Sequence, residues 1–303
     1  MTEAIGQPGE AALPRPMGIG EILRTAFQLY RRHWQTLLAI AAVVVVPLTL
    51  LQYLLGDLVR TQREVTTTDG VVVETPTWSA GLAGLLAALA GLLMYLVLTG
   101  AITRAVAAEV AGQDPSLEQS YRFGFHRLGS VLLVSVLVGL AVLGGLILLA
   151  VAFAIGFAIG FRPQTGSAEE LVLGVLGLLG ALAVILGIYL GVRLAVSIQA
   201  LVVEGRRGTQ AMGRSWGLVG GHWWHAFGTL LVAWLLIGVV NAVITAPFSG
   251  LGWFGQGVAA AVATTVTLPY GVLVGVLLYL ELRARKERLS LETLRADLQA
   301  SAA

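Results

Sequence analysis

Two stretches of the sequence share one pattern, and both stand at the entrance to a long apolar run. Residues 26–34 read AFQLYRRHW and residues 215–223 read SWGLVGGHW. When the two stretches are aligned, His33 falls on His222, and each histidine is followed by a tryptophan. Aromatic and basic residues beside an apolar run are typical of a membrane interface. The repetition predicts one structural unit, an interfacial helix that leads into the membrane, used more than once.

The composition indicates a membrane protein. Hydrophobic residues make up 57% of the chain and charged residues only 12%, and the mean hydropathy is +0.84. Soluble domains carry about 25% charged residues. The sequence has no cysteine, which excludes disulfides, thiol nucleophiles and cysteine-ligated metals. Residues 1–17 are polar and lack periodicity, so we expect a disordered N-terminal tail.

The apolar runs predict six transmembrane helices. A bilayer core of about 30 Å needs about 20 helical residues, and backbone groups in lipid must pair within their own segment. The residues 247–257, rich in turn formers and aromatics, predict an interfacial loop between the last two spans. The predicted spans are about 35–56, 80–104, 129–158, 171–198, 226–246 and 258–282.

The distribution of basic residues predicts the orientation. Of the 19 Lys and Arg residues, all but Arg60, Arg63 and Arg162 lie on the side of the membrane that holds both ends of the chain. Because positive charge stays inside, both termini and the loops 105–127 and 199–225 are expected in the cytoplasm. The predicted location is the cell inner (plasma) membrane, with a multi-pass topology.

A third segment fits the repeated pattern and completes a pseudo-threefold repeat. Glu109 and Glu204 each stand 11 residues before the serine that aligns with Ala26. The predicted fold is an all-α integral membrane protein with six transmembrane helices in three hairpins, each preceded by a cytoplasmic interfacial amphipathic helix. The interfacial segments are 21–34, 115–128 and 208–224. A single transmembrane domain covers 18–288, with repeats at about 18–108, 109–203 and 204–288, and 289–303 form a short cytoplasmic C-terminal tail with an amphipathic pattern.

Glycine pairs predict where helices approach closely. Small residues four apart let transmembrane helices pack backbone against backbone. The pattern occurs at Gly187 and Gly191 and again at Gly271 and Gly275. A chance origin is the alternative, because the apolar segments are rich in glycine.

Several motifs spread over nearly the whole chain resemble a known family. The bacterial family in question has multispanning proteins that are similar to the membrane domain of glycerophosphoryl diester phosphodiesterase. The resemblance implies a membrane domain without catalysis, because the named enzymes use a separate soluble barrel that we expect to be absent here. Glu281 departs from the Asp that is common in the family. The motifs are residues 15–23 (RPMGIGEIL), 192–196 (VRLAV), 203–206 (VEGR), 211–216 (AMGRSW), 222–224 (HWW) and 278–287 (LYLELRARKE).

Candidate functional residues fall into three groups, and none of them predicts a catalytic, cofactor-binding or metal site. His222 and His225 have a spacing that can ligate a metal, but an interfacial aromatic belt is the better interpretation because no carboxylate is near in sequence. A polar path through the membrane is predicted at Asn241, Thr264, Thr265 and Thr267. Anionic-lipid contacts are predicted at Arg31, Arg32, Arg206, Arg207, Arg283, Arg285 and Lys286, and interfacial anchors at Trp34, Tyr121, Trp216, Trp223 and Trp224.

These observations favour a non-enzymatic scaffold, accessory or lipid-interacting membrane component. A permease or lipid-translocating channel is the alternative, and an enzyme of glycerophospholipid metabolism is a second alternative that only the family's name suggests. The expected partners are membrane lipids and other membrane proteins. Nucleic acid is excluded because the basic residues are confined to short loops beside the membrane.

Overall fold

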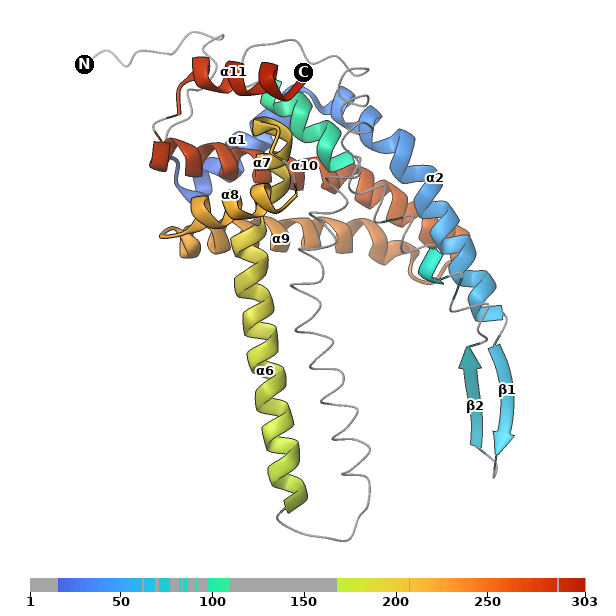
Figure 1. Ribbon diagram of the computed structural model, residues 1–303. Helices are drawn as coiled ribbons and strands as arrows, with labels where there is room; N and C mark the ends of the chain where they lie inside the picture. The colour runs from blue at the N-terminus through green and yellow to red at the C-terminus, as the bar shows by residue number, and fades with distance from the viewer. Residues whose placement is uncertain are drawn as a thin grey trace, which may run out of the picture.

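The structure is a computed structural model that describes residues 16–61, 63–68, 71–76, 82, 84–86, 91, 98–108, 168–206, 208–287 and 289–302. This part of the chain is predominantly helical (Figure 1). Its elements are α1 (Ile19–Arg32), α2 (Trp34–Thr61), β1 (Arg63–Thr68), β2 (Val71–Pro76), α6 (Ala168–Leu194), α7 (Ser197–Glu204), α8 (Thr209–Val219), α9 (Trp223–Thr245), the 3-10 turn η1 (Ala246–Phe248), α10 (Trp253–Glu287) and α11 (Leu291–Ala302), and Leu98–Ala108 is also helical.

Four helical stretches in the described part of the chain are long and apolar enough to cross a membrane. They are Trp34–Gly56, Leu178–Glu204, Trp223–Phe248 and Trp253–Glu287. These stretches confirm that apolar helices occupy the predicted spans at 35–56, 171–198, 226–246 and 258–282. The predicted span at 129–158 lies outside the described residues, as does most of the span at 80–104.

Helix α10 forms the centre of the packing. It contacts α2, α9 and α1, and residues 272–284 are all buried. A Cβ added at Gly271 would lie 3.2 Å from Ile237 Cδ1, and one at Gly275 would lie 2.7 Å from Gln199 Nε2. The prediction that this glycine pair marks close helix contact is confirmed. The missing side chains bring α9 and α7 against α10.

Helix α6 diverges from α9 and α10 and contacts α9 less extensively than α10 does (Figure 1). Leu178, Leu182 and Ile185 are exposed on this helix. Apolar side chains that face no protein are typical of a helix surrounded by acyl chains.

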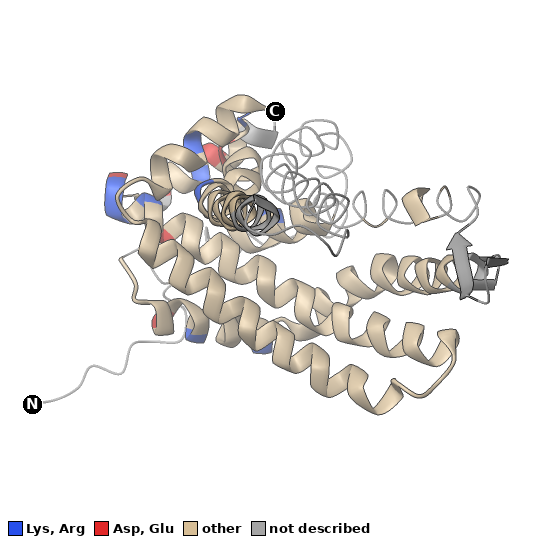
Figure 2. Cartoon of the chain, turned by 90° about the horizontal axis from the view of Figure 1, so that it is seen from below, with Lys and Arg blue, Asp and Glu red and all other residues tan. Residues whose placement is uncertain are grey.

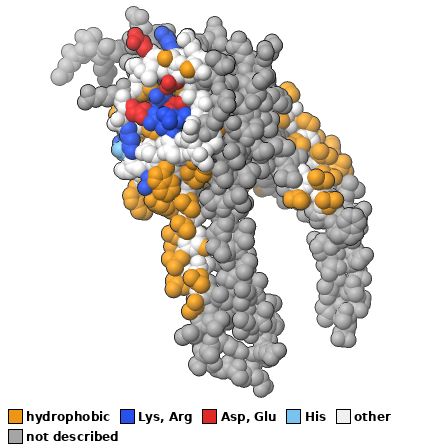
Figure 3. Space-filling model, in the orientation of Figure 1, with side chains coloured by type: hydrophobic (Ala, Val, Ile, Leu, Met, Phe, Trp, Pro, Cys, Tyr) orange, Lys and Arg blue, Asp and Glu red, His pale blue; other side chains and the backbone are white. Residues whose placement is uncertain are grey.

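The charged residues gather at one end of the long helices, which we call the basic end. Figure 2 shows blue and red residues at this end and uncharged residues along the rest of α9 and α10. Figure 3 shows the same separation on the surface, with hydrophobic side chains running down α6 away from the charges. Such a separation fits helices that pass from a polar boundary into a hydrocarbon layer.

A β-hairpin follows the far end of α2, where the sequence analysis predicted only a loop in an all-α protein. Strands β1 and β2 are antiparallel, and Thr68 pairs with Val71. The strands are rich in threonine and valine, which favour extended backbone because their branched Cβ restricts χ1. The fold therefore contains one small sheet in addition to its helices.

Two boundaries between helices differ from the prediction. The fourth span is broken at residues 195–196, where α6 gives way to α7, and the Ser197 hydroxyl donates to the Leu194 carbonyl at 2.7 Å. Breaking the helix frees carbonyls that need new donors, and this hydroxyl supplies one. The predicted loop at 247–257 is shorter, because η1 extends to Phe248 and α10 already begins at Trp253.

Two of the three predicted interfacial segments are separate helices, α1 and α8. His33 closes α1 with φ −120° and ψ 24°, and His222 precedes α9 with φ −125° and ψ 26°. The two histidines that align in sequence therefore occupy the same bend between a short helix and a long one. The third segment, 115–128, and the N-terminal tail up to residue 15 lie outside the described residues.

The predicted C-terminal tail is mostly the helix α11, which packs on α7. The Ser290 hydroxyl accepts a hydrogen bond from the Thr293 amide at 3.2 Å and caps the helix at its first turn. Leu294 and Leu298 are buried, as their amphipathic spacing predicts.

Candidate functional site

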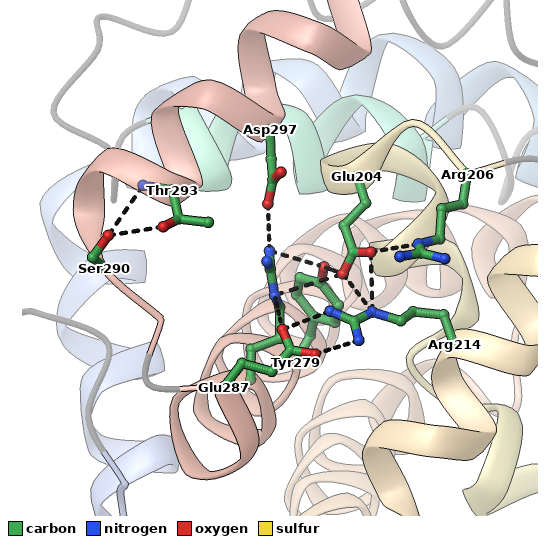
Figure 4. A network of polar contacts seen from close by, with 9 residues as sticks. Glu204, Arg206, Arg214, Tyr279, Glu287, Ser290, Thr293 and Asp297 are labelled. Atoms are coloured by element: carbon green, nitrogen blue, oxygen red, sulfur yellow. Dashed lines mark hydrogen bonds and ion pairs between the residues drawn. The ribbon is translucent and has the colours of Figure 1, made fainter.

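The main polar feature of the basic end is a cluster of six charged residues and one tyrosine. We call it the charge cluster (Figure 4). Its members come from α7, α8, α10, α11 and the α7–α8 connection. They are Glu204, Arg206, Arg214, Tyr279, Arg283, Glu287 and Asp297.

Glu204 is held at the point where α7 ends. Gly205 adopts φ +67°, a left-handed conformation that closes the helix and that glycine accepts without strain. The Glu204 carboxylate accepts hydrogen bonds from Arg206 Nε at 2.6 Å and from the Tyr279 hydroxyl at 2.6 Å. A side chain that is only 7% exposed therefore has charged and neutral donors around it.

Arg214 lies on α8 and joins the ends of the short helix α7 and the long helix α10. Its Nε donates to both carboxylate oxygens of Glu204, at 2.8 and 3.0 Å. Its terminal nitrogens donate to Glu287, one of them at 2.6 Å. Burial by itself lowers the pKa of Arg214, but the hydrogen bonds and charges of Glu287 and Glu204 outweigh it and raise the pKa above its usual value.

Arg283 occupies the middle of the cluster, and its side chain is only 5% exposed. Its Nη1 donates to Asp297 Oδ2 at 2.8 Å, and its Nε donates to Glu287 Oε2 at 3.2 Å, one turn along α10. The same Nε lies 3.6 Å from Glu204 Oε1. One guanidinium therefore links α7, α10 and α11.

The charge cluster is balanced, with three carboxylates and three guanidinium groups. Charges are stable in a protein interior only when they are paired and hydrogen-bonded, and each of these six has a charged partner. The charged groups of the cluster therefore form ion pairs with one another, and these ion pairs connect the ends of α7, α10 and α11.

A second ionic group involves Glu281 and Arg285, which alternate along α10 with the residues of the charge cluster, and it connects α10 to the residues before α1. Glu281 is fully buried; Arg285 contacts one of its oxygens, and His225 Nε2 lies 3.4 Å from the other. Arg285 Nη2 also donates to the Met17 carbonyl at 3.0 Å. The group therefore ties α9 and α10 to the residues that precede α1.

An aromatic cluster surrounds Arg193, which ends α6. The guanidinium lies 4.5 Å from the Trp216 ring centroid and donates to the Trp216 carbonyl at 3.0 Å. The Ser215 hydroxyl donates to the Arg193 carbonyl at 2.8 Å, which satisfies a group freed by the break after α6. Trp223 stacks on Phe227 with 5.0 Å between ring centroids. Helix α8 is thereby fixed against α6, and Trp223 joins α9 to α6 by donating to the Tyr189 carbonyl at 3.3 Å.

Residues 17–281 match a domain of unknown function, DUF7847. The chain belongs to the DUF7847 family. The match covers every described helix from α1 to α9 and most of α10. No curated protein and no solved structure matches the chain. In this DUF7847 chain, Arg283, Glu287 and Asp297 of the charge cluster lie beyond the matched residues.

The predicted interfacial anchors of the DUF7847 chain have different environments. Trp34, Trp216 and Trp224 are exposed, as expected for side chains at a membrane boundary. Trp223 is half-buried between Phe227 and Tyr189. Tyr121 lies outside the described residues.

The predicted lipid-contacting residues of the DUF7847 chain separate into two groups. Arg31 and Arg32 are exposed, and Arg206 keeps 46% of its side chain exposed beside Glu204. Arg283 is buried among carboxylates, so its predicted lipid contact is corrected here. Arg285 and Lys286 are engaged by Glu281 and by the Gly217 carbonyl, and Arg207 lies outside the described residues.

Two of the four residues of the predicted polar path, Asn241 and Thr267, are in contact in the structure. Asn241 Nδ2 donates to Thr267 Oγ1 at 3.1 Å, and Thr267 donates back to the Ala263 carbonyl of its own helix at 2.8 Å. Thr265 is buried and Thr264 is half-buried, and neither has a hydrogen bond to Asn241. The geometry is that of a polar contact between α9 and α10.

Replacing Asn241 with Leu is expected to lower the free energy of unfolding of the DUF7847 chain by about 1 kcal/mol, since hydrogen bonds between membrane helices contribute roughly that amount. Titration of the purified protein with a denaturing detergent measures the change. Ala242→Leu, at the neighbouring exposed position, is the matched control. A loss above about 3 kcal/mol would contradict a simple interhelical contact.

Proposed function

We propose that this chain is a multi-pass inner-membrane scaffold or accessory protein without catalytic activity, with both termini and the basic end in the cytoplasm. The charge cluster carries the proposal. Its ionic groups bind one another and join the cytoplasmic ends of the helices, while exposed aromatic and basic side chains remain on the outer surfaces of α1 and α8. The basic end therefore presents rigid surfaces to lipids and to other membrane proteins.

The proposal includes six spans arranged as three related hairpins. The support is a common burial pattern in the short helices, in which buried residues are four apart. Ile22 and Ala26 of α1 align with Ala211 and Ser215 of α8, and all four are buried. The equivalent bends at His33 and His222 add backbone geometry to the sequence pattern. The resemblance to the membrane domain of glycerophosphoryl diester phosphodiesterase belongs to the same proposal.

The topology is tested by labelling single cysteines, which the cysteine-free sequence makes straightforward. We expect Thr67→Cys in β1 to react with an impermeant maleimide in intact cells. Gln210→Cys, an exposed position of α8, is expected to react only after the membrane is opened. Labelling of both positions in intact cells would refute the proposed topology.

The scaffold role is tested by native mass spectrometry of the tagged full-length chain, purified from membranes together with any bound partner. We expect a stoichiometric partner that is lost when the exposed residues Trp216 and Trp224 are both replaced by Ala, while membrane insertion is retained. The control replaces Trp234, which is exposed on α9 away from the basic end. Substrate flux in vesicles that falls on Asn241→Leu, with no partner detected, would instead support the permease alternative.

A further inference from the structure

The arginines of the basic end divide into those that the protein uses and those that it leaves at the surface. Arg214, Arg283 and Arg285 are bound to carboxylates. On α1 the situation is different: Arg24, Arg31 and Arg32 are exposed, and the described part of the chain shows no ion pair for them. Free positive charge is thus concentrated on one short helix.

The exposed arginines share one side of α1 with an aromatic ring. Ile22 and Ala26 are fully buried on the opposite side, towards α9 and α10, which fixes the rotation of the helix. Phe27 is 53% exposed and Gln28 is exposed beside it. We call Arg24, Phe27, Gln28, Arg31 and Arg32 the α1 stripe. Glu21 lies on the same side one turn before Arg24, so this side of α1 carries three positive charges and one negative charge.

The stripe is continuous with a surface that faces acyl chains. Helix α2 follows α1 after the single residue His33, and Trp34 is 49% exposed at its start. Val43 and Leu51 are exposed further along α2, within the membrane-crossing stretch. The arginines therefore stand at the depth where α2 leaves the hydrocarbon, which is where phospholipid headgroups lie.

We propose that the α1 stripe binds the headgroups of anionic phospholipids, with Phe27 inserted among the upper acyl chains. The proposal rests on the proposed function, since it needs a membrane-inserted chain. Charge complementarity carries it: three exposed arginines outnumber the one acid on this side of α1, Glu21, so a net positive charge meets the phosphates, and the aromatic ring matches the interface. Of the residues predicted from the sequence to contact lipid, Arg31 and Arg32 keep this role, whereas Arg283 and Arg285 bind carboxylates within the protein.

The test places a fluorescent probe on a single cysteine at Gln28→Cys in the full-length chain, reconstituted into phosphatidylcholine nanodiscs. A small fraction of lipid carries a nitroxide quencher on either phosphatidylglycerol or phosphatidylcholine. We expect phosphatidylglycerol to be enriched at the probe on the order of tenfold or more, because each arginine near an anionic surface contributes about fivefold. High salt is expected to reduce the enrichment, because the Debye length falls to about 3 Å at 1 M.

Two sets of variants distinguish the effect of the arginines of the α1 stripe from the effect of the net charge of the protein. Replacing Arg24, Arg31 and Arg32 by Gln is expected to abolish the enrichment, whereas replacing Arg60 and Arg63 by Gln, at the other end of α2, leaves it unchanged. Equal quenching by both lipids, or enrichment that survives the triple replacement, overturns this inference alone. Failure of the labelled chain to enter nanodiscs overturns the proposed function as well.

Discussion

Replacing Arg283 with Gln is expected to lower the free energy of unfolding by about 3 kcal/mol, because it leaves three carboxylates with two guanidinium groups in a partly buried cluster. Arg283 contacts Asp297 at 2.8 Å and Glu287 at 3.2 Å, and both would face one another without it. The measurement is a detergent-denaturation titration of the purified full-length protein, followed by circular dichroism. We also expect α11 to become accessible to protease, because Asp297 is its ionic contact with α10.

The matched control is Arg206→Gln, which removes an arginine from the exposed edge of the same cluster. An exposed ion pair contributes about 0–1 kcal/mol, so this variant should stay close to the parent protein. The double replacement of Arg283 and Asp297 by Gln and Asn should recover part of the loss, since it removes a charge of each sign. Equal effects of Arg283→Gln and Arg206→Gln would contradict the central role of Arg283.

Replacing Arg285 with Gln is expected to cost about 3 kcal/mol or more, because Glu281 would keep a buried charge with its main partner gone. Glu281 is 0% exposed, and Arg285 also donates to the Met17 carbonyl. We therefore expect two results together: a lower midpoint in detergent denaturation and faster proteolysis at the residues before α1.

Lys286→Gln is the matched control for this prediction. Lys286 is adjacent on α10, but its ammonium group donates to the Gly217 carbonyl and not to a buried acid. The double replacement of Glu281 and Arg285 by Gln should be more stable than Arg285→Gln alone, because no unpaired charge remains. If the double variant were the less stable one, the buried charge would not be the cause.

The membrane-crossing helices could be predicted from the sequence because the signal is local. A run of about 20 apolar residues is sufficient to cross a bilayer, whatever its neighbours are. Helices α2, α9 and α10 accordingly follow the predicted spans, and the repeated phrase before α2 and α9 located α1 and α8. The break between α6 and α7 was not predictable in this way, because α8 supplies one of the donors that satisfy it.

The charge cluster could not be predicted, since its partners are far apart in the sequence. Arg214 and Glu287 are separated by 73 residues, and Glu204 and Tyr279 by 75. An arginine at a helix end binds equally well to lipid or to a carboxylate, and the sequence alone does not distinguish them, as Arg283 illustrates. Glu204 carries a partial signal, because it stands 11 residues before Ser215 just as Glu109 stands 11 residues before Ser120.

The β-hairpin has a local signal in the sequence that is independent of the apolar runs. Asp69 and Gly70 separate two runs of threonine and valine, and Asp-Gly between such runs is typical of a two-residue hairpin connection. The register, in which Thr68 pairs with Val71, agrees with that connection. The length of apolar runs, which predicts membrane-crossing helices, does not predict a polar hairpin of this kind.

The composition of the charge cluster has a consequence for biosynthesis. As the chain leaves the ribosome, Glu204 arrives with Arg206 and Arg214, and α10 then adds Arg283 and Glu287, so arginines outnumber carboxylates until Asp297 emerges on α11. The last helix therefore neutralises the assembly. Chains interrupted before that point would lack the carboxylate that accepts from Arg283, so the cluster is completed only when the last helix has been synthesised.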